Sequence, residues 1–247
     1  MYYGETPSKS IVRRFVWWQH QALLGKNFNK TPHVFLASRV AGDVGELRNL
    51  GIKPDDVWAV DADPQACRAL YTRMDRECFR VFNKPVEILL ENPPRTAHPI
   101  RSVFLDFCGT MDGRSKTTVD RVLKRLPVGS VVTITQMRGR ERETIRNRDR
   151  YMRALVEASA AHPVSLVQTI AYQSSKRSPM GVWTFYLGSP VPFVTKVDIS
   201  RYTKTQVTGL TTEGACRSFW QAASKTSSPH EAAVKANATR RRLRDAT

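Results

Sequence analysis

Short apolar runs, rich in β-branched residues, alternate with amphipathic stretches along the middle of this chain. The runs lie at residues 33–38, 57–63, 86–92, 102–107 and 130–137. Strands of continuous apolar character are typical of parallel sheets that are buried on both faces, and helices between them cover those faces. The pattern predicts an α/β fold with three layers and a doubly wound, mostly parallel sheet.

Helices are expected between these runs and at both ends of the chain. The expected helices span residues 11–25, 39–51, 64–82, 114–126, 138–162 and 229–247. Two last strands, at residues 163–174 and 180–189, are predicted to pair antiparallel and to close the sheet. We expect an N-terminal helical extension (1–30), one α/β domain (31–190) and a basic C-terminal extension with a terminal helix (191–247).

The charge of the chain indicates a polyanionic partner. Lys and Arg number 39 against 22 Asp and Glu, a formal net charge of +17, which favours nucleic acid. No run approaches the roughly 18 apolar residues of a membrane span, and the N-terminus matches no secretory signal. We expect a cytoplasmic protein, of a size and charge that suit a virus, without a membrane partner. The four cysteines form no CxxC pair, so neither a metal site nor a disulfide framework is predicted.

Polar and small residues follow each predicted strand, where ligands of open α/β sheets bind. They are Ala37, Ser38, Arg39 and Gly42 after the first strand, Asp61, Ala62 and Asp63 after the second, Glu91 and Asn92 after the third, and Asp106, Phe107, Cys108 and Gly109 after the fourth. We take these residues as the candidate site.

With its "AVDADPQA" segment and its closing hairpin, the chain resembles the class I, Rossmann-like methyltransferases that use S-adenosyl-L-methionine, over residues 33–189. The resemblance implies that the loop after the first strand wraps the methionine part of the cofactor. It implies that Asp61, or else Asp63, binds the ribose hydroxyls, and that Glu91 and Asn92 lie beside the adenine. Residues 106–109 would then border the transferring methyl group. The first loop departs from the family, because it has Arg39 where small residues are usual.

Two other families resemble the stretch "VFLDFCGTMDG", residues 103–113. Haloacid-dehalogenase-like phosphatases carry D-x-D-G-T after an apolar run, which would make Asp106 a nucleophile. Cys108 stands where that family has its second aspartate, and a thiol cannot supply the carboxylate that Mg²⁺ prefers. Cytosine-5 methyltransferases use a cysteine nucleophile after a proline, but here Phe107 precedes Cys108.

A third motif, N/D-P-P-Y/F, holds the target nitrogen in amino methyltransferases. "DFCG" keeps the acid and the aromatic residue of that motif without its prolines. The segment "ENPPR", residues 91–95, carries two prolines, but it follows the third predicted strand and is interpreted as a turn.

Basic residues gather after the fourth and fifth predicted strands and in the last hairpin. The nucleic-acid contacts that we expect are Arg114, Lys116, Arg138, Arg140, Arg142, Lys176 and Arg177. The sequence therefore predicts a methyltransferase acting on a nucleic acid, RNA ahead of DNA. The alternative is a nucleic-acid-binding protein that kept the fold without the cofactor, and a solvated helix with Arg–Glu pairs would also explain part of the basic cluster.

Overall fold

The computed structural model describes most of the residues between 6 and 225. The described residues are 6–37, 41–77, 79–107, 109, 111–137, 145–173, 178–189, 191, 195–200, 207 and 213–225.

Helices and strands alternate as far as the sixth strand. The first half contains α1 (Pro7–Leu24), η1 (Gly25–Lys30), β1 (His33–Leu36), α2 (Gly42–Asn49), η2 (Pro54–Asp56), β2 (Val57–Asp61), α3 (Pro64–Glu77), β3 (Arg80–Asn83), α4 (Val86–Glu91) and β4 (Ser102–Asp106). The second half contains α5 (Gly113–Arg125), β5 (Ser130–Met137), α6 (Ile145–Ser159), β6 (Val164–Gln173), β7 (Pro179–Leu187), β8 (Thr195–Asp198) and α8 (Glu213–Lys225).

Within the described residues, eight strands form one sheet in the order β3-β2-β1-β4-β5-β7-β6-β8. The first five of these strands are parallel. Strand β7 runs antiparallel between β5 and β6, and β8 adds to β6 in parallel. The predicted doubly wound sheet with a closing antiparallel hairpin is confirmed.

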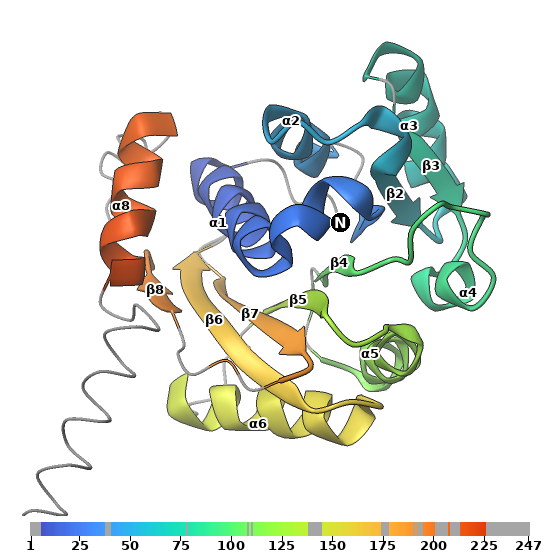
Figure 1. Cartoon of the computed structure of the whole chain (residues 1–247). Coiled ribbons are helices and arrows are strands. Elements are labelled where there is room, and N and C mark those ends of the chain that lie inside the picture. The colour runs from blue at the N-terminus through green and yellow to red at the C-terminus, as the bar shows by residue number, and fades with distance from the viewer. Residues whose placement is uncertain are drawn as a thin grey trace, which may run out of the picture.

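Helices cover both faces of the sheet, and each face has its own apolar core. The first core joins α1, α2 and α3 to one face, and the second joins α4, α5 and α6 to the other. Figure 1 shows α1 and α2 on one side of the strands and α5 and α6 on the opposite side. This two-sided burial explains why the strands are apolar at consecutive positions.

Helix α1, which lies in the segment expected as an N-terminal extension, packs directly on the sheet. It begins at Pro7 behind the cap residue Thr6, whose hydroxyl accepts a hydrogen bond from the Lys9 amide. Trp17 is fully buried, and its indole N–H donates to Asp43 at 2.9 Å. Asp43 also pairs with Arg13 at 3.1 Å, and both side chains are about 95% buried.

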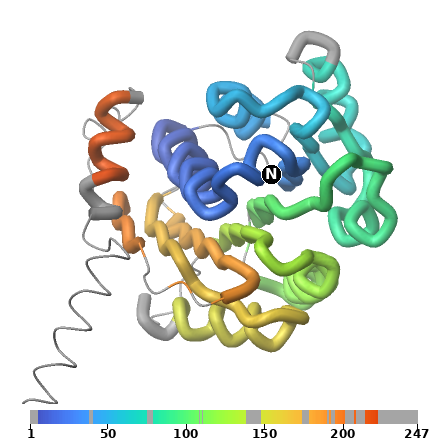
Figure 2. Tube along the Cα trace, in the orientation of Figure 1, coloured from blue at the N-terminus to red at the C-terminus, as the bar shows by residue number. Residues whose placement is uncertain are grey.

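Helix α8 packs against α1 although the two helices lie at opposite ends of the described chain. Figure 2 shows them side by side, blue against red. Phe219 stacks on Phe15, and Trp220 meets Trp18 edge to face. Neither α8 nor β8 was expected from the sequence, and the terminal helix expected at 229–247 lies outside the described residues.

Two buried histidines link α1 to the strands beneath it. The Nε2 atom of His33 lies 2.9 Å from the carbonyl oxygen of Phe28, which can only accept, so Nε2 carries the proton and donates. Nδ1 of neutral His33 then accepts from the hydroxyl of Ser102 at 2.8 Å. The Ser102 oxygen accepts in turn from Nδ1 of His20, also at 2.8 Å. Each histidine has a defined tautomer as a result.

The same chain of hydrogen bonds continues from His20 to β5, β7 and β6. Nε2 of His20 accepts from Thr133 at 2.9 Å, and Thr133 accepts from Thr184 at 2.8 Å. The side-chain oxygen of Gln168 lies 3.2 Å from the Thr184 hydroxyl, and the side-chain nitrogen of Gln168 has no partner among the described residues. Exchanging the amide oxygen and nitrogen lets Gln168 donate to Thr184 and completes the chain.

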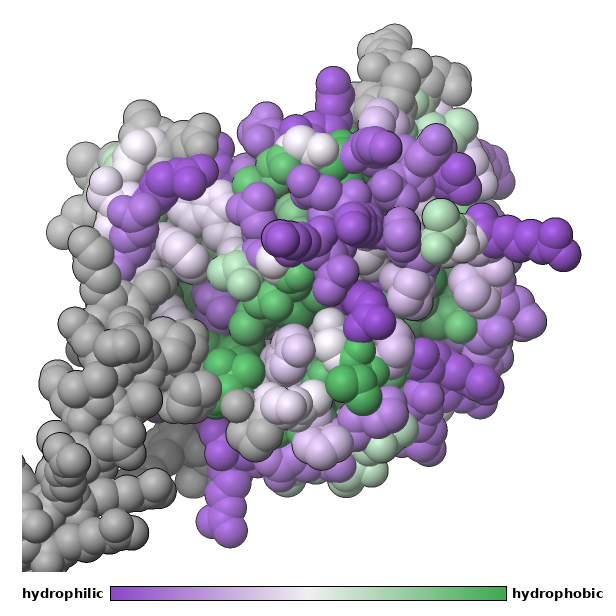
Figure 3. Space-filling view, in the orientation of Figure 1, coloured by the Kyte–Doolittle hydropathy of each residue, from purple (hydrophilic) through white to green (hydrophobic). Residues whose placement is uncertain are grey.

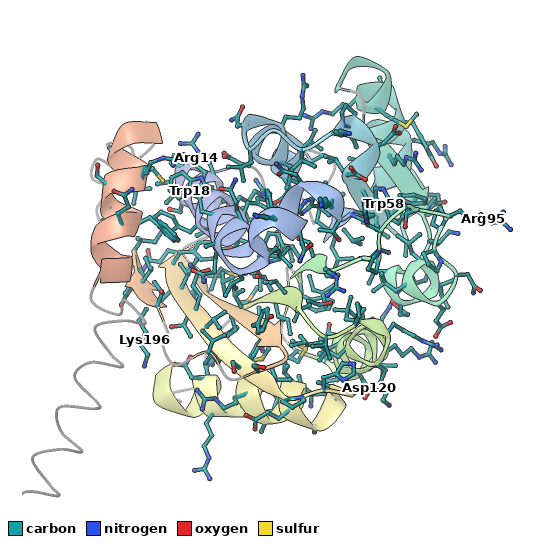
Figure 4. The ribbon with its side chains drawn as sticks, in the orientation of Figure 1. Arg14, Trp18, Trp58, Arg95, Asp120 and Lys196 are labelled. Carbon is teal, nitrogen blue, oxygen red and sulfur yellow. The ribbon has the colours of Figure 1, made fainter. Side chains whose placement is uncertain are left out.

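Two predicted elements are wrong. The helix expected at residues 64–82 ends at Glu77, and residues 80–83 form β3. The strand expected at residues 86–92 is helix α4, in which Val86, Leu89 and Leu90 face the core at helical spacing. The connection after α4 forms no helix or strand, as expected for "NPPR", and Arg95 extends away from the body of the molecule (Figure 4).

Among the residues that Figure 3 colours by hydropathy, hydrophilic ones are widespread, and a smaller hydrophobic area lies near the centre of the view. None of the described helices has the length and hydropathy needed to cross a membrane.

Candidate functional site

A cavity of about 340 Å³ lies at the carboxyl ends of β1, β2 and β4, between α4 and α5. Its lining residues are Leu36, Ala37, Val60, Asp61, Ala62, Pro85, Val86, Glu87, Asp106, Phe107, Arg114, Ser115 and Thr118. This is the edge of an open α/β sheet where ligands bind, and the volume is in the range of small-molecule sites.

Strand β2 delivers Asp61 and Ala62 to the cavity. The Asp61 carboxylate accepts a hydrogen bond from the Asp63 amide at 2.8 Å, and its backbone carbonyl accepts from the Asn83 side chain at 3.2 Å. These contacts fix the end of the strand and orient the carboxylate. Asp63, the second choice for this role, instead accepts from the amide of Gln65 in the first turn of α3. Asp63 does not line the cavity.

The end of β1 contributes Leu36 and Ala37. The Ala37 amide donates to the Val60 carbonyl at 2.9 Å, so the chain stays paired with β2 up to the cavity. Ser38 and Arg39 lie outside the described residues, and Gly42 is the first residue of α2. Ala41, just before it, is buried and has the left-handed angles φ 43° and ψ 45° that a glycine adopts more easily.

Glu91 and Asn92 do not follow a strand, and neither lines the cavity. They lie at the end of α4, where Glu91 pairs with Arg125 at 3.9 Å. The start of the same helix lines the cavity instead of these two residues. It includes Glu87, which accepts a hydrogen bond from Thr118 at 3.5 Å. The periodicity of residues 86–90 after Pro85 could have shown this, but the apolar run also fits a buried strand.

Strand β4 places Asp106 and Phe107 in the cavity wall. The Phe107 amide donates to Thr135 at 3.2 Å, and the Gly109 carbonyl accepts from Met137 at 2.9 Å, so this segment follows β5 beyond the end of β4. A Cβ atom at Gly109 would meet no described atom within 4 Å. Cys108 lies outside the described residues.

Helix α5 closes the cavity with its first two turns. Asp112 caps the helix by accepting from the Ser115 amide at 2.8 Å, and this hydrogen bond holds the pKa of Asp112 below its usual value. Arg114, Ser115 and Thr118 then face the cavity. Only Arg114 of these was expected, as a nucleic-acid contact, because the sequence does not show how α5 is rotated about its axis.

The ionisable groups of the lining are three carboxylates, Asp61, Glu87 and Asp106, and one guanidinium, Arg114. Leucine, valine, proline and phenylalanine side chains make the rest of the wall largely apolar. The three carboxylates supply hydrogen-bond acceptors and give the lining an excess of negative charge. Such a lining suits a ligand with hydroxyl groups, an aromatic ring and a positive centre.

Arg114 and Lys116 are both exposed, and of the two only Arg114 lines this cavity. The other basic residues expected to bind nucleic acid, Arg138, Arg140, Arg142, Lys176 and Arg177, lie outside the described residues.

No family model matches the sequence, and no curated protein matches it. Solved structures do match the fold. An O-methyltransferase from Bacillus cereus in complex with SAH has a TM-score of 0.53 at 16% identity, over 75% of this chain and 84% of that one. A putative class I S-adenosylmethionine-dependent methyltransferase from Listeria monocytogenes has a TM-score of 0.53 at 10% identity, over 81% and 67%. A putative RNA methyltransferase from Pyrococcus horikoshii has 0.51 at 14%, over 76% and 88%. The chain has the fold of class I methyltransferases.

Proposed function

We propose that this chain binds S-adenosyl-L-methionine in the cavity and transfers its methyl group to a nucleic acid, RNA ahead of DNA. The observation that carries the proposal is the position of Asp61, the last residue of β2. Its carboxylate is oriented by the Asp63 amide, and Asp61 lines the cavity of about 340 Å³ at the carboxyl edge of a methyltransferase-type sheet.

The lining fits the cofactor group by group. Asp61 can accept hydrogen bonds from both ribose hydroxyls, since one carboxylate offers several acceptor positions. Glu87 and Ser115 supply polar atoms toward the adenine, between the apolar walls of Val60 and Val86. We propose that Ala37, Ser38, Arg39 and Gly42 contact the methionine part of the cofactor and that Ala62 lies beside the ribose. Asp63 is the alternative to Asp61 for binding the ribose hydroxyls.

The cofactor supplies an activated methyl group, so the protein has mainly to align the nucleophile and exclude water. Asp106 accepts a hydrogen bond from the attacking N–H or O–H group and can take its proton. Phe107 walls the pocket. The open space beside Gly109 lets the substrate approach the backbone. Cys108 is adjacent in sequence, and we assign it no separate role.

The nucleic-acid substrate is supported by charge. The formal net charge is +17, and exposed Arg114 and Lys116 lie on the first turn of α5, where Arg114 lines the cavity. We propose that residues 138, 140, 142, 176 and 177 extend this basic surface. Contacts of this kind bind phosphates and weaken as salt rises.

Calorimetric titration of the full chain with S-adenosylmethionine tests the cofactor site. Asp61→Asn should weaken binding by about 10- to 100-fold, as expected for losing hydrogen bonds to a charged acceptor. The matched control is Asp55→Asn, because Asp55 lies in η2 at the opposite end of the same strand. No heat with wild-type protein that still binds RNA would favour the non-enzymatic alternative.

Transfer is tested with a labelled methyl donor and separate RNA and DNA pools. We expect label in RNA, and a rate at least about tenfold lower for Asp106→Ala, as when a general base is removed. Label in neither pool, despite cofactor binding, would contradict a nucleic-acid substrate.

A further inference from the structure

Two cations on the first turn of α5 have different surroundings. Arg114 lines the cavity. Lys116 lies over the ring of Tyr151 on α6, with its Nζ atom 5.7 Å from the ring centroid. Both basic side chains are exposed. The first turn of α5 therefore borders the cavity through Arg114 and reaches the aromatic ring on α6 through Lys116.

Tyr151 is a large aromatic side chain that remains 41% exposed on this edge. Trp183 on β7, by contrast, is 1% exposed, and its indole N–H donates to Asp149 at 2.8 Å. Trp183 therefore belongs to the core. A nucleotide base can reach the ring of Tyr151 from solvent but cannot reach that of Trp183.

The topology places this ring on the substrate side of the sheet. Helices α5 and α6 follow β4 and β5, which are parallel, so both helices start at the carboxyl edge where the cavity lies. Tyr151 is in the second turn of α6, and Lys116 is in the first turn of α5. The positive end of the α5 dipole adds to the attraction for phosphate there.

We infer that Tyr151, Lys116 and Arg114 form a platform for a single-stranded nucleic acid, with one base stacked on Tyr151 and the flanking phosphates bound by Lys116 and Arg114. The inference rests on the proposed function and specifies how its substrate is held. Lys116, now over the ring, moves to a phosphate when the base stacks. A duplex keeps its bases inside, so only an unpaired strand offers a base to the ring.

Anisotropy of a labelled twelve-nucleotide single-stranded RNA of mixed sequence, titrated with the full chain, tests the platform. Tyr151→Ala should raise the Kd by about 5- to 100-fold, the effect of one lost base–aromatic stack. Tyr151→Phe keeps the ring and should change the Kd by about twofold or less. Lys116→Ala should reduce the slope of log K against log salt by about 0.7, the value for one phosphate contact on a single strand.

The charge control is Lys53→Ala, because exposed Lys53 directly precedes η2 and β2 at the amino edge of the sheet. It should change the Kd by about twofold or less. An unchanged Kd for Tyr151→Ala would overturn the platform. So would a duplex of the same sequence that binds as tightly as the single strand and loses affinity equally in that variant.

Cofactor titrations on the same preparations separate this inference from the proposed function. Tyr151→Ala should keep wild-type affinity for S-adenosylmethionine, because Tyr151 does not line the cavity. If wild-type protein binds no cofactor but its RNA affinity depends on Tyr151, the proposed function fails and the platform stands. If cofactor binds and RNA affinity does not depend on Tyr151, the platform alone fails.

Discussion

Two groups of polar side chains lie on the same sheet, and they differ in where their hydrogen bonds go. Between α1 and the sheet, His20, His33 and Ser102 are buried and bond to one another in a chain that runs on to β6. At the carboxyl edge, Asp61 and Asp106 border an open cavity. The first group has used its hydrogen-bonding capacity within the buried interior, whereas the carboxylates of the second line a cavity.

This difference shows that a buried histidine is not by itself evidence of a site. Burial lowers the pKa of His33 to about 4, and burial together with the charge of His33 lowers that of His20 well below its usual value. Both rings are therefore neutral near pH 7 and serve to hold α1 on β1, β4 and β5. Changes in the two groups should affect different quantities, stability in the first and binding in the second.

The largest effect on stability is expected from Asp43→Asn on the α1 side. The variant removes the carboxylate charge that pairs with the buried Arg13 guanidinium at 3.1 Å, and breaking a buried ion pair costs about 3–5 kcal/mol. Urea unfolding monitored by circular dichroism measures it. The control Asp120→Asn, in an exposed pair with Lys124, should change the free energy of unfolding by about 0.5 kcal/mol or less. Equal losses in both variants would contradict the assignment.

Acid should destabilise the fold through the two histidines. Because the folded pKa of each lies below the unfolded value of about 6.5, the unfolded chain binds more protons, and stability falls as the pH drops below about 6.5. For His33 the loss continues to about pH 4, at about 1.4 kcal/mol per pH unit. Urea unfolding between pH 7.5 and 4.5 should show a slope that becomes shallower in His20→Gln. An unchanged slope would show that His20 does not titrate in this way.

Asp61→Asn provides the contrasting result at the cavity. The asparagine oxygen can still accept from the Asp63 amide, so the free energy of unfolding should change by about 1 kcal/mol or less, although the proposed cofactor binding should weaken. Urea unfolding without added ligand is the measurement. A loss as large as that of Asp43→Asn would mean that Asp61 is a structural residue like Asp43.

The smallest effect is expected at Ala41, whose left-handed backbone directly precedes α2. Ala41→Gly loses a buried methyl group but relieves the unfavourable φ of 43°, so the two effects should cancel to within about 0.5 kcal/mol. In the control Ala59→Gly, in the middle of β2, nothing offsets the loss, and about 1–2 kcal/mol of stability should disappear. Thermal unfolding of the pair decides whether the backbone at Ala41 is strained.

The parts predicted well from the sequence are those with one clear periodicity. Strands β1, β2, β4 and β5 were expected because each is a continuous apolar run, and their ends place Ala37, Asp61, Asp106 and Phe107 in the cavity. The prediction failed at α4, whose six residues are too few to distinguish helix from strand by pattern alone. Glu87 was missed for that reason, and Glu91 was chosen in its place.

By itself the sequence determined the class of fold and the strand ends, because periodicity and turn chemistry are local properties that adjacent residues carry. Only the tertiary structure decided which polar side chains are satisfied inside the protein and which face the cavity. Asp43 lies in the first turn of α2 and Asp61 is the last residue of β2, yet the first is buried against Arg13 and Trp17 and the second lines the cavity. That choice depends on the packing of α1 and on the rotation of α4 and α5, which join residues far apart in the chain.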